Sequence, residues 1–230
     1  LLFNNRIYGL TKGQYSPTSE VGKITKSTPM GSLDNPFNPV SLALGAEATF
    51  VARTMDSDRK HLTSVLRAAA DHKGTALVEI YQNCNIFNDG AFDVLKEADT
   101  RDDWTIPLEH GRPLRFGTPD ENGVCSRAVV RGESGLMHVE DGVATDDPRV
   151  VVHDAHIDDP AYAFELSRIS SIDSRYAPMG VFRNVQRPVY DEQMLAQLDA
   201  AAVKAQESGQ GSDDSALDAL LAGADTWQVA

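Results

Sequence analysis

Cysteine is scarce in this 230-residue sequence, which contains only Cys84 and Cys125. Two cysteines are too few for a disulfide scaffold, and so low a number suits a reducing compartment such as the cytoplasm. Long apolar runs are absent as well, because no stretch approaches the roughly 18 to 20 apolar residues of a membrane span. We therefore expect a cytoplasmic protein that does not cross a membrane.

Basic residues are also few. The sequence has 21 Lys and Arg against 34 Asp and Glu, which gives a formal net charge of -13. This balance argues against nucleic acid and anionic membrane surfaces as partners, because both attract basic patches. The sequence does not begin with Met, and we expect no signal peptide in it, because Leu1-Leu2-Phe3 lacks a basic n-region. The three apolar residues are typical of the end of a buried strand, so we expect a fragment of a longer protein.

A polar loop follows that apolar stub, running from Asn4 to Gln14 and on into Ser16–Ser19. Ligands of α/β proteins bind where a strand opens into such a loop. The adjacent Asn4 and Asn5 offer neutral oxygen atoms, and the irregular backbone after them offers carbonyls. Mg²⁺ holding a diphosphate uses few protein ligands, all of them hard oxygens. The residues alone leave two interpretations open, a cofactor-binding loop and an ordinary polar turn.

Alternating strand and helix patterns predict a parallel α/β sheet in the first half of the chain. Strands are expected at 49–53 and 75–80. One helix is expected after Asn38, with Pro39 at its first position, and a second after Ser57 or Asp58, ending at Gly74. The long polar stretch 15–36 between loop and first helix is expected to wrap a cofactor or a partner.

The second half has weaker patterns. Residues 99–143 are acidic and rich in turns, which indicates short strands or a loop extension. Further strands are expected at 150–153 and 181–183, a helix after Asp159, a helix over 191–206 and a short terminal helix around Leu217. We predict three parts: the C-terminal part of a cofactor-binding domain at 1–98, a partner-docking extension at 99–206, and a linker with a terminal helix at 207–230.

Several motifs resemble one known family. They are Asn4–Gln14, Gly31–Pro39, Glu79–Cys84, Ile86–Gly90, His153–Ala155 and Asp158–Phe164. Together they cover most of the chain and resemble the thiamine-diphosphate-binding β subunits of 2-oxoacid:ferredoxin oxidoreductases. The resemblance is strongest to the 2-oxoglutarate:ferredoxin oxidoreductases of actinobacteria. It implies a thiamine-diphosphate-binding parallel-sheet domain with a mixed, loop-rich C-terminal extension.

The resemblance also implies roles for individual residues. Asn5 and the carbonyl of Ile7 match two Mg²⁺ ligands of the family, whose third ligand, in a Gly-Asp-Gly segment, has no counterpart in this sequence. Gly9 is expected to allow close approach of the backbone to the cofactor. Leu10 matches the 2-oxoglutarate branch, and Lys12 is a counter-ion for the second carboxylate of that substrate. A solvated Lys12 is the alternative.

Thr11 is a candidate for hydrogen bonding to the cofactor, without a more definite role. Cys84 alone would be taken for an inert core thiol, but the resemblance makes it the fourth ligand of a [4Fe–4S] cluster. Cys125 matches no cluster position. His153 and His156 are interpreted as the edge of a docking region, and Ser16–Ser19 lacks the glycine elbow of a nucleophilic serine.

The function implied is oxidative decarboxylation of 2-oxoglutarate with coenzyme A, which gives succinyl-CoA and CO₂ and passes electrons through the cluster to ferredoxin. An α subunit is the expected partner, in an α2β2 assembly, and it should supply the glutamate that activates the cofactor. The chain alone is therefore expected to be inactive. Two alternatives remain: a subunit acting on pyruvate or another 2-oxoacid, and a non-catalytic docking subunit.

Overall fold

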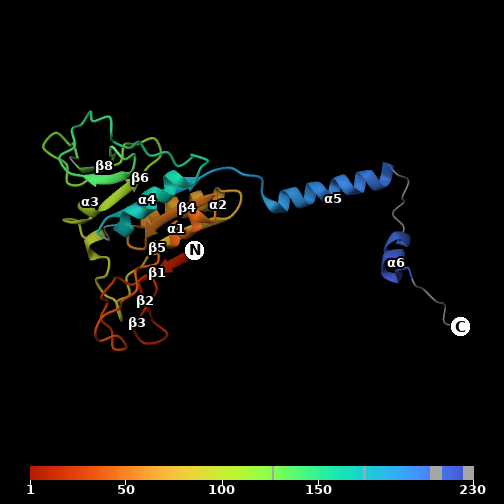
Figure 1. The fold of residues 1–230 in the computed structure, drawn as a ribbon, viewed down its shortest axis with the longest axis horizontal. Helices are drawn as coiled ribbons and strands as arrows, with labels where there is room; N and C mark the ends of the chain where they lie inside the picture. Colours follow the sequence, from red (N-terminus) through yellow and green to blue (C-terminus); the bar gives the residue numbers. More distant parts are fainter. Residues whose placement is uncertain (126, 173–174, 208–213, 225–230) are drawn as a thin grey trace. The chain divides into compact units, whose positions relative to one another are not determined.

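The computed structural model describes residues 1–125, 127–172, 175–207 and 214–224 (Figure 1). The chain divides into two compact units, with the boundary between Arg187 and Pro188. Each unit is described separately below. No helix in the described ranges is long and apolar enough to cross a membrane.

A five-stranded mixed sheet forms the centre of the first unit. Its strands lie in the order β1-β5-β4-β10-β6 and span Leu2–Asn4 (β1), Ala76–Tyr81 (β5), Phe50–Met55 (β4), Ala177–Asn184 (β10) and Thr105–Leu108 (β6). Strand β5 pairs in parallel with both β1 and β4, whereas β10 runs antiparallel to β4 and parallel to β6. The predicted α/β class with a mostly parallel sheet is confirmed.

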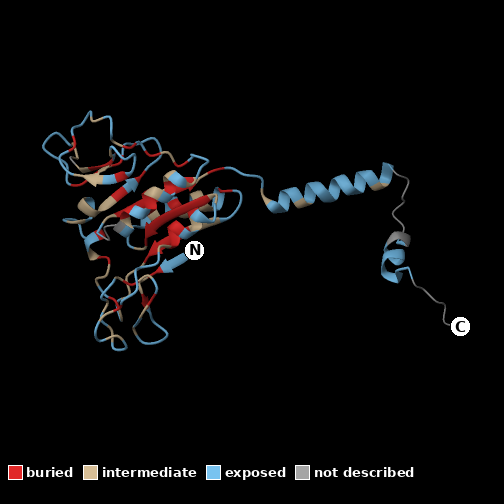
Figure 2. Ribbon diagram, viewed as in Figure 1, coloured by how far each residue is buried: buried red, intermediate tan, exposed pale blue. Residues whose placement is uncertain are grey.

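Helices cover both faces of this sheet. Helices α1 (Pro39–Gly45) and α4 (Ala161–Ile172) pack on one face, where Val51 and Phe182 contribute to a buried cluster. Helix α2 (Arg59–Asp71) packs on the other face against Phe50. The alternation of neighbouring strand residues between two cores is the pattern of a sheet buried on both sides. Figure 2 shows the strands of the sheet as mostly buried.

Side-chain caps start these helices where the sequence predicts them. The Asn38 Oδ1 atom accepts a hydrogen bond of 3.1 Å from the backbone N–H of Ser41, and the Asp58 Oδ1 atom accepts one of 3.0 Å from His61. Asp159 Oδ1 likewise accepts from the N–H of Ala161 at 2.8 Å. Each bond satisfies a donor that has no partner within its own helix. The predicted helix starts at Asn38, Asp58 and Asp159 are confirmed.

The expectation of a buried N-terminal strand is only half right. Strand β1 is present, but it lies at the edge of the described sheet, with β5 as its neighbour. The side chains of Leu1, Leu2 and Phe3 are exposed by 72%, 37% and 57%. Within the described residues, only one edge of this strand is paired, which fits the exposure of these side chains.

The predicted boundary after residue 98 does not coincide with a boundary between compact units. Strands β6 and β10 both follow residue 98, and both belong to the central sheet. The segment expected to form a short strand at 181–183 is part of the eight-residue β10, which pairs on both sides. The strand expected at 150–153 is reduced to isolated bridges at Val150 and Val152.

Between β6 and α4 the chain forms a second, antiparallel sheet. Its strands are β7 (Arg115–Phe116), β8 (Arg127–Arg131) and β9 (Met137–Glu140). A short 3₁₀ helix (Asp93–Leu95) and α3 (Arg101–Trp104) lead into β6. The expectation of short strands in this turn-rich segment is confirmed. Its core residue Val129 belongs to the same cluster as α1 and α4, which ties the small sheet to the large one.

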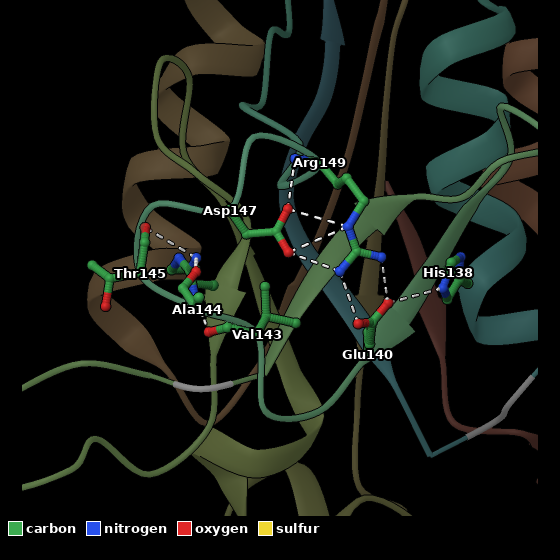
Figure 3. A network of polar contacts seen from close by, with 8 residues as sticks. His138, Glu140, Val143, Ala144, Thr145, Asp147 and Arg149 are labelled. Atoms are coloured by element: carbon green, nitrogen blue, oxygen red, sulfur yellow. Dashed lines mark hydrogen bonds and ion pairs between the residues drawn. The ribbon is translucent and has the colours of Figure 1, made fainter.

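Arg149 organises the exposed side of this small sheet (Figure 3). Its two terminal nitrogens each donate a 2.9 Å hydrogen bond to Glu140, and it also binds Asp147 at 2.7 Å. Arg149 holds the pKa of both carboxyl groups below their ordinary values through these hydrogen bonds. Arg115 donates to the backbone carbonyls of 143, 144 and 145 nearby. This network fixes a loop rather than forming an open site.

The second unit contains two helices, α5 (Tyr190–Glu207) and α6 (Ser215–Ala222). Both match the helices that the sequence predicts. Apolar side chains of α5 such as Leu195 and Leu198 are exposed by 62% and 58%. Most of the predicted linker at 207–214 lies outside the described residues.

Candidate functional site

The loop that follows β1 is anchored by Asn4. This side chain is buried, and its Nδ2 atom donates to Glu79 Oε1 at 2.7 Å. Its Oδ1 atom accepts from the Thr18 hydroxyl at 2.7 Å and from the backbone N–H of Arg6 at 3.2 Å. Both ends of the amide are therefore engaged inside the protein, and Asn4 acts as a structural anchor.

Glu79 and Arg53 form a buried ion pair next to this anchor. They lie opposite each other on the parallel strands β5 and β4, and Arg53 Nε lies 2.7 Å from Glu79 Oε2. Burial opposes the charge on Arg53, yet its pKa is raised, because Tyr81 and the Glu79 carboxylate face it. The guanidinium also stacks 5.2 Å from the centre of the Tyr81 ring. Three adjacent strands thus contribute Asn4, Glu79 and Arg53 to one polar row.

Asn5 is oriented differently from Asn4. It is only half-buried, and its Oδ1 atom accepts one hydrogen bond of 3.3 Å, from the N–H of Ile7. The Asn5 carbonyl accepts from Asn88 Nδ2 at 2.9 Å, and the Arg6 carbonyl accepts from Ser19 Oγ at 2.6 Å. Arg6 has a positive φ of 54°, which turns the chain sharply between Asn5 and Ile7. The two backbone carbonyls point to protein donors, whereas the Asn5 side-chain oxygen has only a single long hydrogen bond.

A two-stranded hairpin presents the next four candidate residues. Strands β2 (Ile7–Tyr8) and β3 (Gln14–Tyr15) pair, and Gly9, Leu10, Thr11 and Lys12 form the connection between them. Leu10 is 94% exposed, and Lys12 has a positive φ of 64°. Thr11 Oγ1 lies 3.5 Å from the carbonyl of Tyr8. The structure links Asn5 to Ile7, and it places Leu10, Thr11 and Lys12 at an exposed tip.

Cys84 lies in the loop after β5, next to the loop that holds Asn5. The Cys84 thiol is half-buried, and the Cys84 carbonyl accepts from the N–H of Asn88 at 2.9 Å. Asn88 is buried, and its side chain contacts both the Asn5 carbonyl and the Lys23 ammonium. The sequence analysis gave Asn88 no role, although it lies within one of the quoted motifs, Ile86–Gly90. Only the fold shows that it joins two loops that are 83 residues apart.

A cavity of about 570 Å³ lies beside the anchored loop, on the α4 side of the sheet. Its charged lining residues are the cations Arg6, Arg53 and Arg168 and the anions Glu20 and Glu79. A second cavity, of about 690 Å³, lies at the start of α2 and includes His61 and Cys125. Burial lowers the pKa of His61, so this imidazole is neutral near pH 7.

His153 and His156 bind to the backbone of the sheet. His153 is fully buried, with Nδ1 3.0 Å from the Tyr162 hydroxyl and Nε2 2.8 Å from the Val181 carbonyl. His156 Nδ1 lies 2.6 Å from the Asn184 carbonyl. Burial lowers the pKa of His153 and raises the pKa of Tyr162 to about 12. These contacts give both histidines a role in holding β10 in place.

Comparison with known proteins identifies the fold. Residues 1–80 match the thiamine pyrophosphate enzyme, C-terminal TPP-binding domain. The whole chain is 56% identical over 230 residues to the 2-oxoglutarate oxidoreductase subunit KorB of Mycobacterium tuberculosis and spans 58% of that protein. Over 89 residues it is 44% identical to a 2-oxoacid:ferredoxin oxidoreductase β subunit of Saccharolobus solfataricus, which covers 39% of this chain and 29% of that subunit. Along its whole length, the chain is thus similar to a 2-oxoglutarate oxidoreductase subunit, and part of it is similar to 2-oxoacid:ferredoxin oxidoreductase β subunits.

A solved structure agrees with this similarity. The 2-oxoglutarate:ferredoxin oxidoreductase of Magnetococcus marinus, determined with 2-oxoglutarate, coenzyme A and succinyl-CoA bound, superposes with a TM-score of 0.60 at 27% identity. The match covers 98% of this chain and 57% of that one. The chain thus spans between half and two thirds of the length of these two relatives. The likeness across nearly the whole chain includes the small sheet and not only the matched domain at 1–80.

The loop that holds Asn5 offers oxygen atoms of the kind that bind Mg²⁺ held by a diphosphate. Amide and carbonyl oxygens are hard, neutral ligands, and a magnesium ion takes the rest of its six oxygens from phosphate and water. The half-buried Asn5 side chain has the free lone pair that such a ligand needs, whereas Asn4 does not. In the described ranges, no three or more His, Cys, Asp or Glu side chains converge on a metal position. The donor set here is therefore a partial one.

The cluster role predicted for Cys84 likewise requires more ligands than this sequence holds. A [4Fe–4S] cluster takes four thiolates, and this sequence holds two cysteines in all. Cys125 donates from Sγ to the Gly117 carbonyl at 3.2 Å, and burial raises its pKa, so it is a protonated thiol. Cys84 lies in a loop that contacts the loop of Asn5 through the Asn88 side chain. The roles predicted for Asn5, Ile7, Gly9, Leu10, Thr11, Lys12 and Cys84 stay predictions.

Proposed function

We propose that this chain is the catalytic β-subunit region of a 2-oxoglutarate:ferredoxin oxidoreductase. The observation that carries the proposal is the 56% identity, over the full 230 residues, to a 2-oxoglutarate oxidoreductase subunit. The reaction joins the four-carbon product of 2-oxoglutarate decarboxylation to coenzyme A, releases CO₂ and reduces two ferredoxins. Archaeal relatives named as 2-oxoglutarate synthase subunits support the same substrate, at 33% to 34% identity.

Thiamine diphosphate, when bound, supplies the nucleophilic carbon and the electron sink for this chemistry. The chain's contribution is to hold and orient that group. The Asn5 side chain and the Ile7 carbonyl are the proposed Mg²⁺ ligands, and Gly9 leaves the space in which a cofactor could approach. A Cβ atom built on Gly9 meets no atom within 4 Å, so no residue of this chain requires glycine there. Thr11 is proposed as a further hydrogen-bonding residue.

Leu10 and Lys12 are the proposed determinants of substrate choice. A lysine ammonium that is shielded from water favours a substrate with a second carboxylate over pyruvate. Both residues are exposed in the isolated chain, at the tip of the β2–β3 hairpin. We infer that a partner α subunit, in an α2β2 assembly, covers this tip and completes the site. The proposal includes that the chain alone is inactive and that the assembly lies in the cytoplasm, which the low cysteine count supports.

Cys84 is proposed as one thiolate ligand of a [4Fe–4S] cluster that passes electrons to ferredoxin. The support is the position of Cys84 in the loop after β5. Asn88 in the same loop donates hydrogen bonds to the Cys84 carbonyl and to the Asn5 carbonyl, and so connects the two loops. A cluster beside the cofactor can accept electrons one at a time, as ferredoxin requires. This assignment depends on three further thiolates from outside the present sequence.

The deciding experiment uses the complete β subunit co-purified with its α subunit without oxygen. Viologen reduction is followed with coenzyme A and either 2-oxoglutarate or pyruvate. Faster turnover with 2-oxoglutarate, dependent on coenzyme A and thiamine diphosphate, is expected. A preference for pyruvate would keep the family and overturn the substrate, and no activity with any 2-oxoacid would favour a docking role.

Two variants of the same complex test the site residues. Asn5→Ala is expected to lose thiamine diphosphate and Mg²⁺, which chemical analysis of the purified complex measures, and Asn4→Ala provides a structural comparison. Retention of both by Asn5→Ala would remove the loop assignment. Cys84→Ser is expected to abolish or shift the low-potential iron–sulfur signal in electron paramagnetic resonance spectra. The matched variant Cys125→Ser should leave that signal unchanged.

A further inference from the structure

Asn88 is the contact point of three segments that lie far apart in the sequence. Its backbone N–H donates to the Cys84 carbonyl at 2.9 Å, within the loop after β5. Its side-chain Nδ2 donates to the Asn5 carbonyl at 2.9 Å, and its Oδ1 accepts from the Lys23 ammonium. The residue is 5% exposed, so water does not compete strongly for these bonds.

The chemistry of the partners fixes the direction of the Asn88 amide. A lysine ammonium can only donate, so the amide oxygen must face Lys23. A backbone carbonyl can only accept, so the amide nitrogen must face Asn5. Both requirements are met by one orientation. An asparagine fits here and an aspartate does not, because a carboxylate would oppose the Asn5 carbonyl with a second acceptor.

Lys23 is itself held in position. Its ammonium lies 3.0 Å from Glu20 Oε1, and hydrogen bonds with this lysine contribute to holding the Glu20 pKa below its ordinary value despite burial. The backbone N–H of Lys23 donates to Ser32 Oγ at 3.1 Å, and the Lys23 carbonyl accepts from the N–H of Ser32. The polar stretch around the site is therefore part of the same network.

A second contact joins the same two loops. Gly13, which directly precedes β3 in the hairpin connection, has a φ of +97°, and a Cβ atom built on it would lie 3.1 Å from Phe87 Cδ1. Phe87 is the neighbour of Asn88 in the loop after β5. The loop of Cys84 thus touches the cofactor loop on both sides of the hairpin, at Asn5 and at Gly13.

We propose that Asn88 is a positioning residue that couples the Cys84 segment to the Asn5 segment. A movement of either loop changes the other, because one buried side chain is bonded to both. The inference rests on the proposed function, in which these segments hold the iron–sulfur cluster and Mg²⁺–thiamine diphosphate. Coupling of this kind is reciprocal. The change that cofactor binding makes to the reduction free energy of the cluster equals the change that cluster reduction makes to the binding free energy of the cofactor.

The test uses the complete αβ complex, purified without oxygen, with the substitutions Asn88→Asp and Asn83→Asp. Asn83 is the matched control, because Asn83→Asp also sets a carboxylate against an acceptor in the same loop, here the Asp89 carboxylate that Asn83 Nδ2 contacts at 2.7 Å, but Asn83 has no bond to the Asn5 segment in the described structure. The affinity for thiamine diphosphate is measured by calorimetry in excess Mg²⁺. Asn88→Asp is expected to weaken it about tenfold, the ratio that one lost hydrogen bond supports, and Asn83→Asp should leave it unchanged.

The second readout is the midpoint potential of the cluster, titrated with and without Mg²⁺–thiamine diphosphate. The unsubstituted complex is expected to show a shift on cofactor binding, which Asn83→Asp keeps and Asn88→Asp loses. Thermal unfolding of the two variants checks that a general loss of structure does not cause the difference. Equal affinities and equal shifts in the two variants would overturn the inference. A complex that binds no thiamine diphosphate before any substitution would overturn the proposed function as well.

Discussion

The central sheet and the loop at residues 5–37 are held together in different ways. In the sheet, the three inner strands β5, β4 and β10 pair on both sides, and apolar side chains fill a core on each face. In the loop, individual side chains such as Ser19 and Asn88 bond to backbone carbonyls, and Leu10, Met30 and Leu33 are each more than 90% exposed. The comparison teaches that apolar packing and strand pairing hold the sheet, whereas individual hydrogen bonds hold the loop, for which we propose a binding role.

Among the substitutions considered, a change of Arg53 in the sheet is expected to lower the free energy of unfolding most. Arg53→Met leaves the Glu79 carboxylate buried without its partner, and breaking a buried pair costs about 4 kcal/mol. The free energy of unfolding, from urea denaturation, is expected to fall by that amount. Arg53→Met combined with Glu79→Gln removes both charges and should recover most of the loss. Equal stability of the single and double variants would contradict this account.

Two glycine substitutions test the same difference between the sheet and the loop. Gly180 in β10 has a φ of +132°, and a Cβ atom there would lie 2.5 Å from the Leu108 carbonyl oxygen of β6. Gly180→Ala is therefore expected to lower the free energy of unfolding by about 3 kcal/mol. Gly9→Ala in the loop meets no atom and should leave thermal unfolding unchanged, while it weakens cofactor binding. A stability loss as large for Gly9→Ala would remove the distinction between the regions.

Acid should destabilise the first unit through the buried His153 and the half-buried His61. Burial lowers the folded-state pKa of His153 and of His61 below the unfolded value of about 6.5. The unfolded chain then binds more protons as the pH falls below about 6.5, so stability is present above that pH and is lost below it. Urea denaturation from pH 7.5 to pH 5 measures the slope. His153→Gln should flatten it, and an unchanged slope would rule out His153 as a cause.

The smallest effect on stability is expected at the hairpin tip. Lys12→Met changes an exposed residue, so the free energy of unfolding should move by less than about 0.5 kcal/mol. In the assembled enzyme the KM for 2-oxoglutarate should rise by about tenfold, because a charge-assisted contact is lost. The KM for pyruvate should not change. An equal rise in KM for both substrates would show that Lys12 does not bind the second carboxylate of 2-oxoglutarate.

The sequence correctly predicted those helices whose first residues are determined by neighbouring side chains. Asn38 before Pro39 and Asp58 before an amphipathic segment carry their own capping chemistry, so these helices could be placed without the fold. The membership of β6 and β10 in the central sheet could not be predicted, because strand neighbours depend on pairing across 70 residues or more. The motifs pointed to Asn5 and Cys84. The bridge at Asn88 could not be found, since its partners become neighbours only after folding.

The position of β10 has a consequence for folding while the chain is synthesised on the ribosome. Strand β10 pairs with β4 on one side and with β6 on the other, and it is the last strand of the sheet to be synthesised. Until residue 184 has emerged, β4 and β6 both present open edges, and the sheet is divided in two. Open strand edges attract other chains, and pairings distant in sequence form slowly. The loop at residues 5–37 therefore rests on a complete sheet only after translation has passed residue 184, and unpaired strand edges favour aggregation during this interval.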